Sequence, residues 1–373
     1  MTQFGAPAFA ADLARALAAR ETNRVDIPLI QPAEPFLDMA GEDLRRRIFL
    51  TESETGESLC LRPEFTIPVC RAHIAEGVAT PRRYAYLGEV FRQRRDGSSE
   101  FFQAGVEDLG EPDEARADAR AVSDARALAA EFAPGAALTI TLGDQSVFEA
   151  VVAGLGLPAG WQKRLIHAFG NEQALRAMIA RLASPDSSAA PDGAVAAFLA
   201  AGDAAGLEAH IESVMEATGY STHASRSPAE ITARLMDKQA LAATRLSAAS
   251  LAALKSFLAL DVTLDRAAAA LSSFARDAGL DIAAAQARFE ARLSALAARG
   301  EDLATMRWRA AFGRPLDYYT GLVFEVAVGE AGLVLAGGGR YDRLMALLGA
   351  REPIPAVGFS LWLDRIETVR AGR

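Results

Sequence analysis

A long stretch of helix-forming residues divides this 373-residue sequence into two flanking parts that are both rich in predicted strands. Between residues 160 and 300 alanine is frequent and aromatic residues are few, and polar breaks near 184–192 and 219–227 separate the helical patterns. Strand patterns resume shortly after this stretch. We therefore interpret residues 160–300 as a helical insertion in a core whose first part is 1–159 and whose second part is 301–373.

The composition is that of a globular protein with room for two or three domain-sized units, since 51% of the residues are hydrophobic. The formal net charge of −9 gives no general basic field for nucleic acid, and no apolar run is long enough to span a bilayer. The alanine-rich N-terminus favours an amphipathic helix over a secretory signal. Two cysteines, Cys60 and Cys70, and four scattered histidines lack metal-site spacing, so we expect no metal and buried thiols in a reducing cytoplasm.

The segment GRPLDYYTGLVFE, Gly313 to Glu325, combines charge, aromatic hydroxyls and a predicted strand. Arg314 lies near its start, Tyr318 and Tyr319 follow, and the branched and aromatic residues after Gly321 are typical of a strand. A cation and two hydroxyl-bearing rings beside a sheet indicate a site for a small charged ligand. The alternative is a hairpin whose tyrosines are partly buried with their hydroxyls in water.

The segment LRPEFTIPVCRAHIAEG places a carboxylate and a hydroxyl at a strand-to-helix junction. Pro63 restricts the backbone, Glu64 and Thr66 follow it, and an apolar helix is predicted from about Ile67. Both side chains would be held rigidly enough to form part of a site. They could equally be a pair that caps the N-terminus of that helix.

Two further strands are predicted at 82–94 and 100–108, joined by a short loop. Alternation along the second strand puts Phe101, Gln103, Gly105 and Glu107 on one face. Gln103 and Glu107 could therefore reach one cavity from a single wall. The alternative is a polar, solvent-facing edge, although the apolar neighbours make a wholly exposed strand a poorer interpretation.

The remaining patterns are shorter. We expect a helix at 115–132 and a strand at 138–142. Near the C-terminus we expect a strand at 333–336, a close turn at Gly337 to Gly339, a helix from Tyr341, a strand at 356–360, and a helix from Leu361.

Four passages taken together, LRPEFT, FRQR with EFFQAGVE, RPLDYYTGLVFE, and GGGRYD with PAVGFSLWLDR, resemble the core of histidyl-tRNA synthetase. They lie in the expected order on both sides of the insertion. The resemblance implies an α+β fold of the class II aminoacyl-tRNA synthetase type, with an antiparallel sheet flanked by helices and usually dimeric. No C-terminal anticodon-binding domain is expected.

The resemblance also implies a histidine pocket. Glu64 and Gln103 would accept from the ligand's ammonium, and Arg314 would bind its carboxylate. Glu107 and Tyr319 would bracket the imidazole nitrogens. The full set of ligand-binding residues that the resemblance implies is Glu64, Thr66, Gln103, Glu107, Arg314, Tyr318 and Tyr319.

The departures from the synthetase pattern fall at its nucleotide site. Arg94 replaces a glutamate, and Trp362 replaces a glycine beside the ATP position, where an indole would fill the space of an adenosine. Arg92 and Arg365, the phosphate-binding arginines of the class, are retained. These four residues are identified as a degenerate nucleotide site, although Trp362 could also be ordinary core packing.

A retained histidine pocket beside an altered ATP site resembles the regulatory subunits of ATP phosphoribosyltransferase, a family paralogous to the synthetase. The resemblance implies a non-catalytic subunit needed for the first step of histidine biosynthesis. It would form a core dimer and a cytoplasmic hetero-oligomer with a short catalytic subunit, activate that subunit, and convey feedback inhibition by histidine. It would need no cofactor, and neither tRNA nor membrane would be a partner.

Two other functions remain open from the sequence. A histidine-activating ligase is favoured by Arg92, Arg314 and Arg365, since binding phosphate and carboxylate is most of adenylation catalysis. It is disfavoured by Arg94 and Trp362. An RNA-binding module is disfavoured by the acidic composition and by the lack of a basic aromatic stripe.

Overall fold

The computed structural model of the chain describes residues 5–39, 41–95, 97–184, 193–218, 227–314, 318–329 and 332–372, with the side chain of residue 42 left out. The strands are β1 Asn23–Arg24, β2 Ile30–Pro32, β3 Leu50–Glu52, β4 Ser58–Leu61, β5 Arg82–Phe91, β6 Glu100–Leu109, β7 Leu138–Asp144, β8 Asp261–Thr263, β9 Met306–Arg309, β10 Leu322–Val328, β11 Leu333–Arg340 and β12 Ala356–Trp362.

Helices account for most of the remaining described residues. They are α1 Ala10–Ala18, α2 Glu34–Met39, α3 Gly41–Arg45, α4 Thr66–Glu76, α5 Glu114–Phe132, α6 Gln145–Gly154, α7 Ala159–Ala168, α8 Glu172–Ala183, α9 Ala194–Ala201, α10 Ala204–Thr218, α11 Pro228–Ala243, α12 Ala248–Leu258, α13 Leu264–Ala278, α14 Ala283–Ala298, the 3-10 turn η2 Leu303–Thr305, α15 Asp342–Leu347 and α16 Leu363–Ala371.

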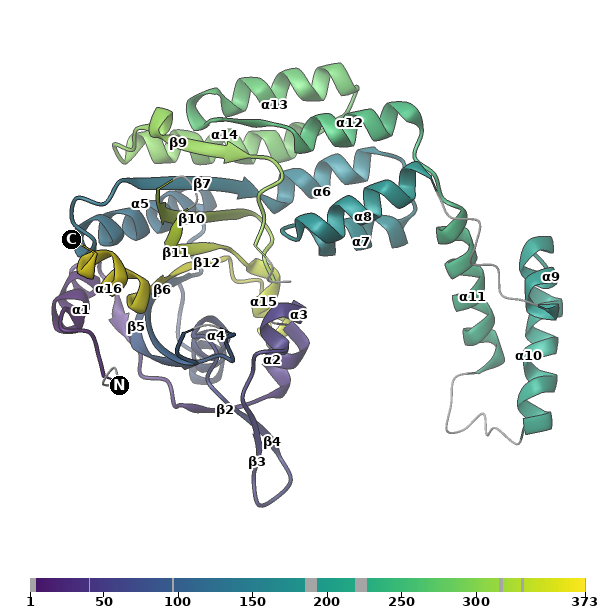
Figure 1. Cartoon of the computed structure of the whole chain (residues 1–373), viewed down its shortest axis with the longest axis horizontal. Helices are drawn as coiled ribbons and strands as arrows, with labels where there is room; N and C mark the ends of the chain where they lie inside the picture. The colour runs from purple at the N-terminus through teal and green to yellow at the C-terminus, as the bar shows by residue number, and fades with distance from the viewer. Residues whose placement is uncertain are drawn as a thin grey trace.

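The main sheet joins strands from both sides of the predicted insertion. Its order is β1-β5-β6-β12-β11-β10-β7-β9-β8, so the three late strands β10, β11 and β12 lie between β6 and β7 (Figure 1). Neighbouring strands run antiparallel except in the pairs β1·β5 and β7·β9, which are parallel. The α+β sheet flanked by helices is therefore confirmed, with the correction that the sheet is mixed.

One face of the sheet is covered by α5, which lies against β10, β11 and β12 and in turn contacts α14. Asp113 caps α5 by accepting a hydrogen bond from the backbone N–H of Arg116 at 3.0 Å. The buried face of α5 is largely alanine, which lets the helix approach the strands closely. The largest apolar cluster of the molecule fills this layer.

The opposite face packs against α2, α4 and α15 through a second apolar cluster, and this cluster holds the tyrosines of the predicted ligand site. A small sheet of order β2-β4-β3 lies beside it. Cys60 and Cys70 are free and buried here, as predicted. Alternation along β6 is also confirmed, because Phe101 belongs to this cluster and Phe102 and Val106 belong to the first one.

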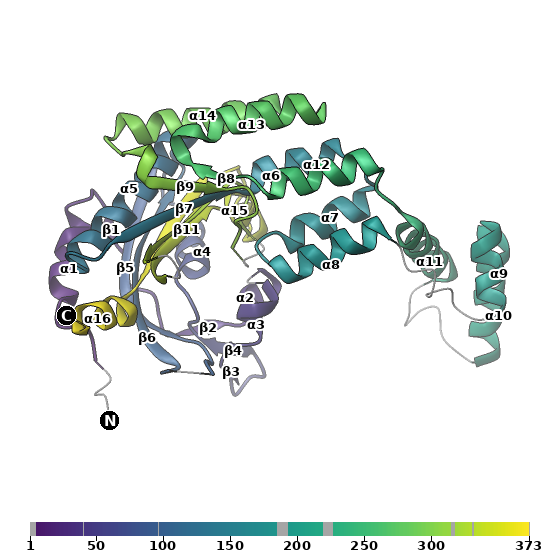
Figure 2. The same ribbon diagram turned by 45° about the horizontal axis from the view of Figure 1, so that its top comes forward.

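The stretch predicted as an insertion contains α7 to α14 together with the short strand β8, which pairs with β9 at the edge of the main sheet. Helices α9, α10 and α11 form a projecting arm with an apolar cluster of its own, whereas α12 to α14 contribute to the main core (Figure 2). The boundaries at 159/160 and 300/301 stay a prediction. Most of the two predicted polar breaks lies outside the described residues.

Two predictions near the C-terminus were wrong. Gly337 to Gly339 do not form a turn but continue β11, where their missing side chains leave room for residues above the sheet. The helix predicted from Leu361 begins at Leu363, because β12 stays paired with β6 as far as Trp362 opposite Gln103. Within the described residues, no helix is both long and apolar enough to cross a membrane.

Candidate functional site

A cavity of about 330 Å³ opens on the face of the sheet that carries the second apolar cluster. Its walls come from α3, the start of α4, the residue after β5, β6, the residues before β10, β10 itself, β11, β12 and the start of α16. The predicted site residues that line it are Glu64, Thr66, Arg92, Gln103, Arg314, Tyr318, Tyr319, Trp362 and Arg365.

Glu64 both caps α4 and faces the cavity. Its carboxylate accepts from the backbone N–H of Thr66 at 2.6 Å and of Ile67 at 2.9 Å. The residue is 5% exposed, and burial raises the pKa of its carboxyl, an effect that these backbone bonds and the Arg92 guanidinium oppose. The capping interpretation is thus observed, and it fixes the carboxylate at the cavity wall.

Glu107 lies behind the wall rather than in it. Its carboxylate accepts a hydrogen bond from the Thr66 hydroxyl at 2.8 Å and another from the hydroxyl of Tyr341. Both of those residues line the cavity, while Glu107 is 1% exposed. Burial raises its pKa to about 8, an effect that the two hydroxyl donors oppose. Glu107 would therefore act on a ligand chiefly through Thr66 and Tyr341.

Tyr341 is a site residue that the sequence reasoning did not assign. It lies at the end of the GGGRYD passage, next to β11, and is 1% exposed. Its contact with Glu107 spans 234 positions of the chain. The signal available beforehand was its place in that passage, one residue beyond the three glycines that leave space above the sheet.

Gln103 is buried in the interior of the sheet and points into the cavity. The solvent-facing alternative for its strand is therefore wrong, because β6 pairs with β5 on one side and β12 on the other. Neither the amide nitrogen nor the amide oxygen of Gln103 has a hydrogen-bond partner among the described residues. A buried amide without partners indicates that a ligand or water supplies them.

Arg314 approaches the sheet where Gly337 leaves room for it. A Cβ at Gly337 would lie 2.0 Å from the Arg314 Nη1 atom. Nη1 pairs with the Glu325 carboxylate at 2.7 Å, while the buried Nε has no partner in the described part of the chain. Arg314 can thus donate to a ligand carboxylate while one nitrogen stays anchored.

Tyr318 and Tyr319 are 5% and 8% exposed and belong to the second apolar cluster. Both line the cavity, so they are core residues and wall residues at once. Burial raises the pKa of Tyr319, an effect that the Arg314 guanidinium opposes. The acidic residue of the same passage, Asp317, lies outside the described residues.

The four residues of the predicted degenerate nucleotide site do not all face one space. Arg92, Trp362 and Arg365 line the cavity, whereas Arg94 is turned away, pairing with Asp364 at 2.8 Å. The indole of Trp362 is 7% exposed, and the guanidinium carbons of Arg314 and Arg365 lie 5.6 Å and 4.8 Å from its ring centre. Trp362 is therefore packed in the core and also fills part of the cavity.

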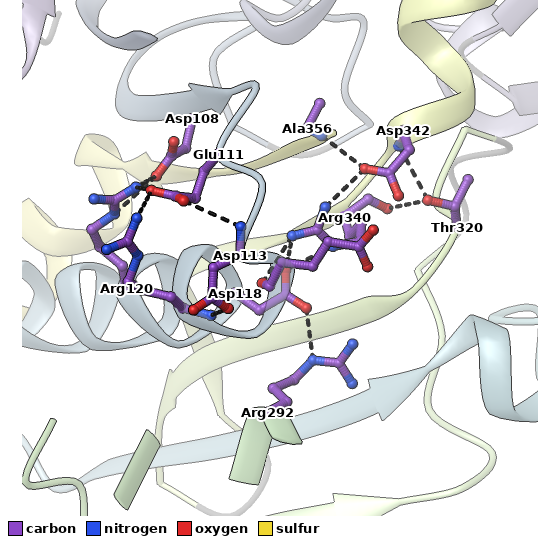
Figure 3. Close-up of polar contacts among 12 residues, drawn as sticks. Asp108, Glu111, Asp113, Asp118, Arg120, Arg292, Thr320, Arg340, Asp342 and Ala356 are labelled. Carbon is purple, nitrogen blue, oxygen red and sulfur yellow. Dashed lines mark hydrogen bonds and ion pairs between the residues drawn. The ribbon is translucent and has the colours of Figure 1, made fainter. Parts of the chain in front are cut away.

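A polar network holds the loop that carries the two tyrosines (Figure 3). The Thr320 N–H donates to the backbone oxygen of Arg340 at 2.8 Å, and the Asp342 N–H donates to the Thr320 hydroxyl at 3.1 Å. Asp342 also accepts from the Arg340 guanidinium at 2.8 Å and from the Ala356 N–H at 2.7 Å. The loop is thus tied to β11, α15 and β12.

The same network reaches the helices of the predicted insertion. Asp118 on α5 is fully buried between Arg340 and Arg292, with contacts of 2.7 Å to each. Arg292 belongs to α14 and also pairs with Asp144 at the end of β7. Buried charges in this arrangement are compensated as a set, so loss of one leaves the others uncompensated.

The cavity presents carboxylate, amide, phenol and guanidinium groups within a volume suited to a small zwitterion. Groups of three or more potential metal-binding side chains do not occur among the described residues. The cavity is therefore suited to bind a ligand with an anionic end, a cationic end and hydrogen-bonding atoms between them.

Comparison with known proteins agrees with this geometry. The sequence pattern of the family described as Histidyl-tRNA synthetase matches residues 11–236 and 211–366. The ATP phosphoribosyltransferase regulatory subunits of Allorhizobium ampelinum and Sinorhizobium medicae are each 64% identical to the chain, over 365 and 370 residues. Those alignments cover 98% of this chain and 98% of each relative.

Solved structures support the fold. An ATP phosphoribosyltransferase regulatory subunit/histidyl-tRNA synthetase from Bacillus halodurans superposes with a TM-score of 0.65 and 20% identity, covering 99% of this chain and 81% of that one. Histidyl-tRNA synthetase from Nostoc sp. PCC 7120 superposes with a TM-score of 0.64 and 16% identity, and the match covers 100% of this chain and 77% of that one. These likenesses confirm the class II synthetase-like fold, and the sequence identity over nearly the whole length is more specific. The chain belongs to the family of ATP phosphoribosyltransferase regulatory subunits.

Proposed function

We propose that the cavity binds L-histidine as a regulatory ligand. The observation that carries the proposal is Gln103, a buried amide that faces the cavity and has no partner among the described residues. A ligand ammonium or carboxylate would supply the missing bonds. The free Nε of Arg314 is a second unsatisfied group on the same wall.

The wall residues suit the three functional groups of histidine. Glu64 can accept from the ammonium while its backbone bonds hold it in place, and Arg314 can donate to the carboxylate. Tyr319 and Thr66, the latter backed by Glu107, can meet the imidazole nitrogens. An adenosine has less room, because Trp362 fills part of the same cavity.

As a member of this family, the chain is a non-catalytic subunit that acts with an ATP phosphoribosyltransferase catalytic partner in histidine biosynthesis. We infer that the partner is the short form of that enzyme and that the regulatory chain activates it. Histidine would favour one of two arrangements of the assembled complex, and a coupling of about 1–3 kcal/mol would suffice for feedback inhibition.

We further infer that the chain dimerises through its core and does not bind tRNA. The formal charge of −9 supports the second inference, since binding to polynucleotide needs a basic surface. Buried free thiols support a cytoplasmic location. Sedimentation of the isolated chain, and a mobility shift with tRNA at low salt, would test the two inferences separately.

The decisive experiment mixes the purified chain with a short-form catalytic subunit and measures turnover with and without histidine. We expect the rate to rise on mixing and to fall when histidine is added. Calorimetry on the chain alone and on the complex would show where histidine binds. Absence of histidine binding to both would refute the proposal.

The same preparation tests the ligase alternative. Histidine-dependent exchange of labelled pyrophosphate into ATP by the isolated chain would establish adenylation and overturn the regulatory interpretation of the cavity. We expect no exchange above that of a blank, because Trp362 fills part of the cavity and Arg94 is paired with Asp364 rather than turned toward it.

A further inference from the structure

A second, smaller cleft of about 160 Å³ borders the cavity proposed to bind histidine. Tyr319 lines both spaces, and no other described lining residue is common to them. The cleft is formed by residues of α6, α7 and α15, and none of the four residues of the degenerate nucleotide site is among its described lining residues. Besides Tyr319 these are Gln145, Lys163, Ile166, His167, Phe169 and Arg343.

All four polar side chains that accompany Tyr319 in the cleft can donate hydrogen bonds. Lys163, His167 and Arg343 are exposed, whereas Gln145 is buried, at 8% exposed. No carboxylate is among the described lining residues. Donors gathered without an acceptor carboxylate favour an oxyanion as the ligand.

Most of these donors are still available to a ligand. Lys163 has no hydrogen bond or ion pair within the described part of the chain. Arg343 donates from one Nη atom to the Glu149 carboxylate at 2.7 Å, which offsets its charge but leaves its other nitrogens free to donate. The amide nitrogen of Gln145 has only long contacts, of 3.4 Å each, to Glu149 and to the Ile166 carbonyl. A buried amide bonded this weakly indicates room for a stronger partner.

The elements around the cleft also hold the loop that carries Tyr319. After Tyr319, the Gly321 carbonyl accepts a hydrogen bond from the backbone N–H of Gln145 at 2.8 Å. Before it, Gly313 packs directly on Gly170 in the turn after α7, where a Cβ on Gly170 would lie 2.7 Å from the Gly313 carbonyl carbon. The position of α6 and α7 therefore sets the position of the loop.

We propose that the cleft binds a phosphate-sized oxyanion and that its occupancy strengthens histidine binding through Tyr319. Ammonium, guanidinium and amide donors from three helices can surround a tetrahedral anion. The anion would join Lys163 on α7 to Arg343 on α15 and so restrain the loop that these helices border. Histidine would then bind a loop that is already ordered, which gives positive coupling between the two ligands. Binding of the anion is independent of the function proposed above, whereas the coupling rests on it.

Titration calorimetry of the full-length chain with inorganic phosphate, in a phosphate-free buffer at constant ionic strength, tests the binding. Acetate is the comparison, since it is planar and carries a single charge. We expect phosphate to bind more tightly than acetate, because only a tetrahedral dianion can accept from all the donors of the cleft.

Histidine titrations with and without saturating phosphate measure the coupling. We expect the histidine Kd to fall about fivefold or more when phosphate is present. The phosphate Kd should fall by the same factor when histidine is saturating, because coupling between two binding sites is reciprocal.

The informative variant is the double change Lys163→Gln and Arg343→Gln, which alters two exposed side chains outside the histidine cavity. We expect phosphate affinity to fall about tenfold or more, and the effect of phosphate on histidine to disappear. The matched control, Lys255→Gln with Arg288→Gln, removes the same two types of charge from exposed positions on α12 and α14. It should leave both affinities and the coupling unchanged.

Absence of phosphate binding by the native chain, or equal weakening in the control, would overturn the anion site. Phosphate that competed with histidine equally in the native chain and the double variant would occupy the histidine cavity instead, and the proposal would be wrong. An unchanged histidine Kd at saturating phosphate would refute the coupling. If histidine did not bind at all, the function proposed above would fail, while the phosphate titrations would still decide whether the cleft binds an anion.

Discussion

Gln103 is a buried amide that contributes no hydrogen bond to the folded protein as described. Leaving such a group unsatisfied costs on the order of 1–3 kcal/mol of stability. A residue with this cost is most simply explained by a ligand that pairs with it. Its contribution to folding and its contribution to binding should therefore be separable by one substitution.

We predict that Gln103→Met weakens histidine binding about tenfold or more, because the ligand loses its partner on β6. The free energy of unfolding should stay within about 1 kcal/mol of the native value or rise, since the methionine fills a similar volume without an unpaired amide. Calorimetry and urea unfolding measure the two quantities. In the mixed enzyme assay, inhibition by histidine should be relieved.

Gln31→Met is the matched control for that prediction. Gln31 is 7% exposed, lies outside the cavity, and donates to the Pro28 carbonyl at 2.8 Å. Its loss should lower stability by about 1 kcal/mol and leave histidine affinity unchanged. If the two variants behaved alike, Gln103 would be a structural residue only.

Glu107 gives a pH prediction. Burial raises its pKa from 4.5 to about 8, so between those values the folded chain holds a proton that the unfolded chain has lost. The associated stability is fully present below about pH 4.5 and is lost as the pH rises through about 8. Glu107→Gln cannot ionise. We predict that its stability relative to the native chain rises with pH, by at most about 1.4 kcal/mol per pH unit.

Urea unfolding of both proteins at about pH 5, 7 and 9 checks this difference. Other groups titrate in both chains alike, so the comparison isolates Glu107. A constant difference across the range would mean that its carboxyl has the same pKa in the folded and unfolded states.

At the scale of single residues, the sequence predicted part of the site. Alternation along 100–108 correctly placed Gln103 on the ligand face. It could not show that Glu107 lies behind Tyr341, because that contact joins residues 234 positions apart. Nor could it show that Arg314 is already paired with Glu325 on the neighbouring strand. Spacing along one element predicts faces, whereas partners on other elements follow from the three-dimensional packing.

At the scale of elements, α14 is joined to the ligand loop by buried charges. Arg292 on this helix pairs with Asp118, which pairs with Arg340, whose backbone holds Thr320 beside Tyr319. Removing one member leaves buried carboxylates without full compensation. The link is therefore a stability element as well as a physical connection between the insertion and the site.

We predict that Arg292→Met lowers the free energy of unfolding by about 3–5 kcal/mol, since Asp118 and Asp144 lose a shared partner. Arg288→Met, on the exposed face of the same helix, should change it by no more than about 0.5 kcal/mol. Urea unfolding with tryptophan fluorescence measures both. Equal urea midpoints for the two variants would show that the contacts of Arg292 make no net contribution to stability.

The elements themselves were largely predictable where a pattern was long. The helix expected at 115–132 is α5, and the strands expected at 100–108 and 138–142 are β6 and β7. The ends of the elements were less predictable. Strand β12 continues to Trp362 because it stays paired with β6, a strand distant in the sequence. The parallel pairs β1·β5 and β7·β9 had no local signal.

At the scale of the whole molecule, the arm formed by α9 to α11 is separate in its packing. Its buried hydrophobic residues, Leu199, Leu207, Ile211 and Met215, form a cluster separate from the main core. Where the arm leaves the body, the Leu246 N–H donates to the Leu182 carbonyl at 3.1 Å. The two ends of the arm segment are therefore close enough to be joined directly.

We predict that replacing residues 185–240 with a flexible linker of about eight residues leaves the rest of the molecule folded. Histidine affinity should stay within about threefold of the native value, since no arm residue lines the cavity. Calorimetry for binding and for thermal unfolding measures both effects. Loss of the main unfolding transition would show that the arm is required for the core.

The position of β10, β11 and β12 between β6 and β7 affects how the protein can be made. On the ribosome, β6 and β7 emerge before the whole helical stretch, whereas β12, which pairs with β6, and β9 and β10, which pair with β7, emerge after it. Throughout that interval one edge of β6 and both edges of β7 lack their partner strands, and unpaired edges are templates for pairing with other chains. Protection of those edges by chaperones, and the speed at which the final strands are synthesised, should therefore govern the yield of folded protein.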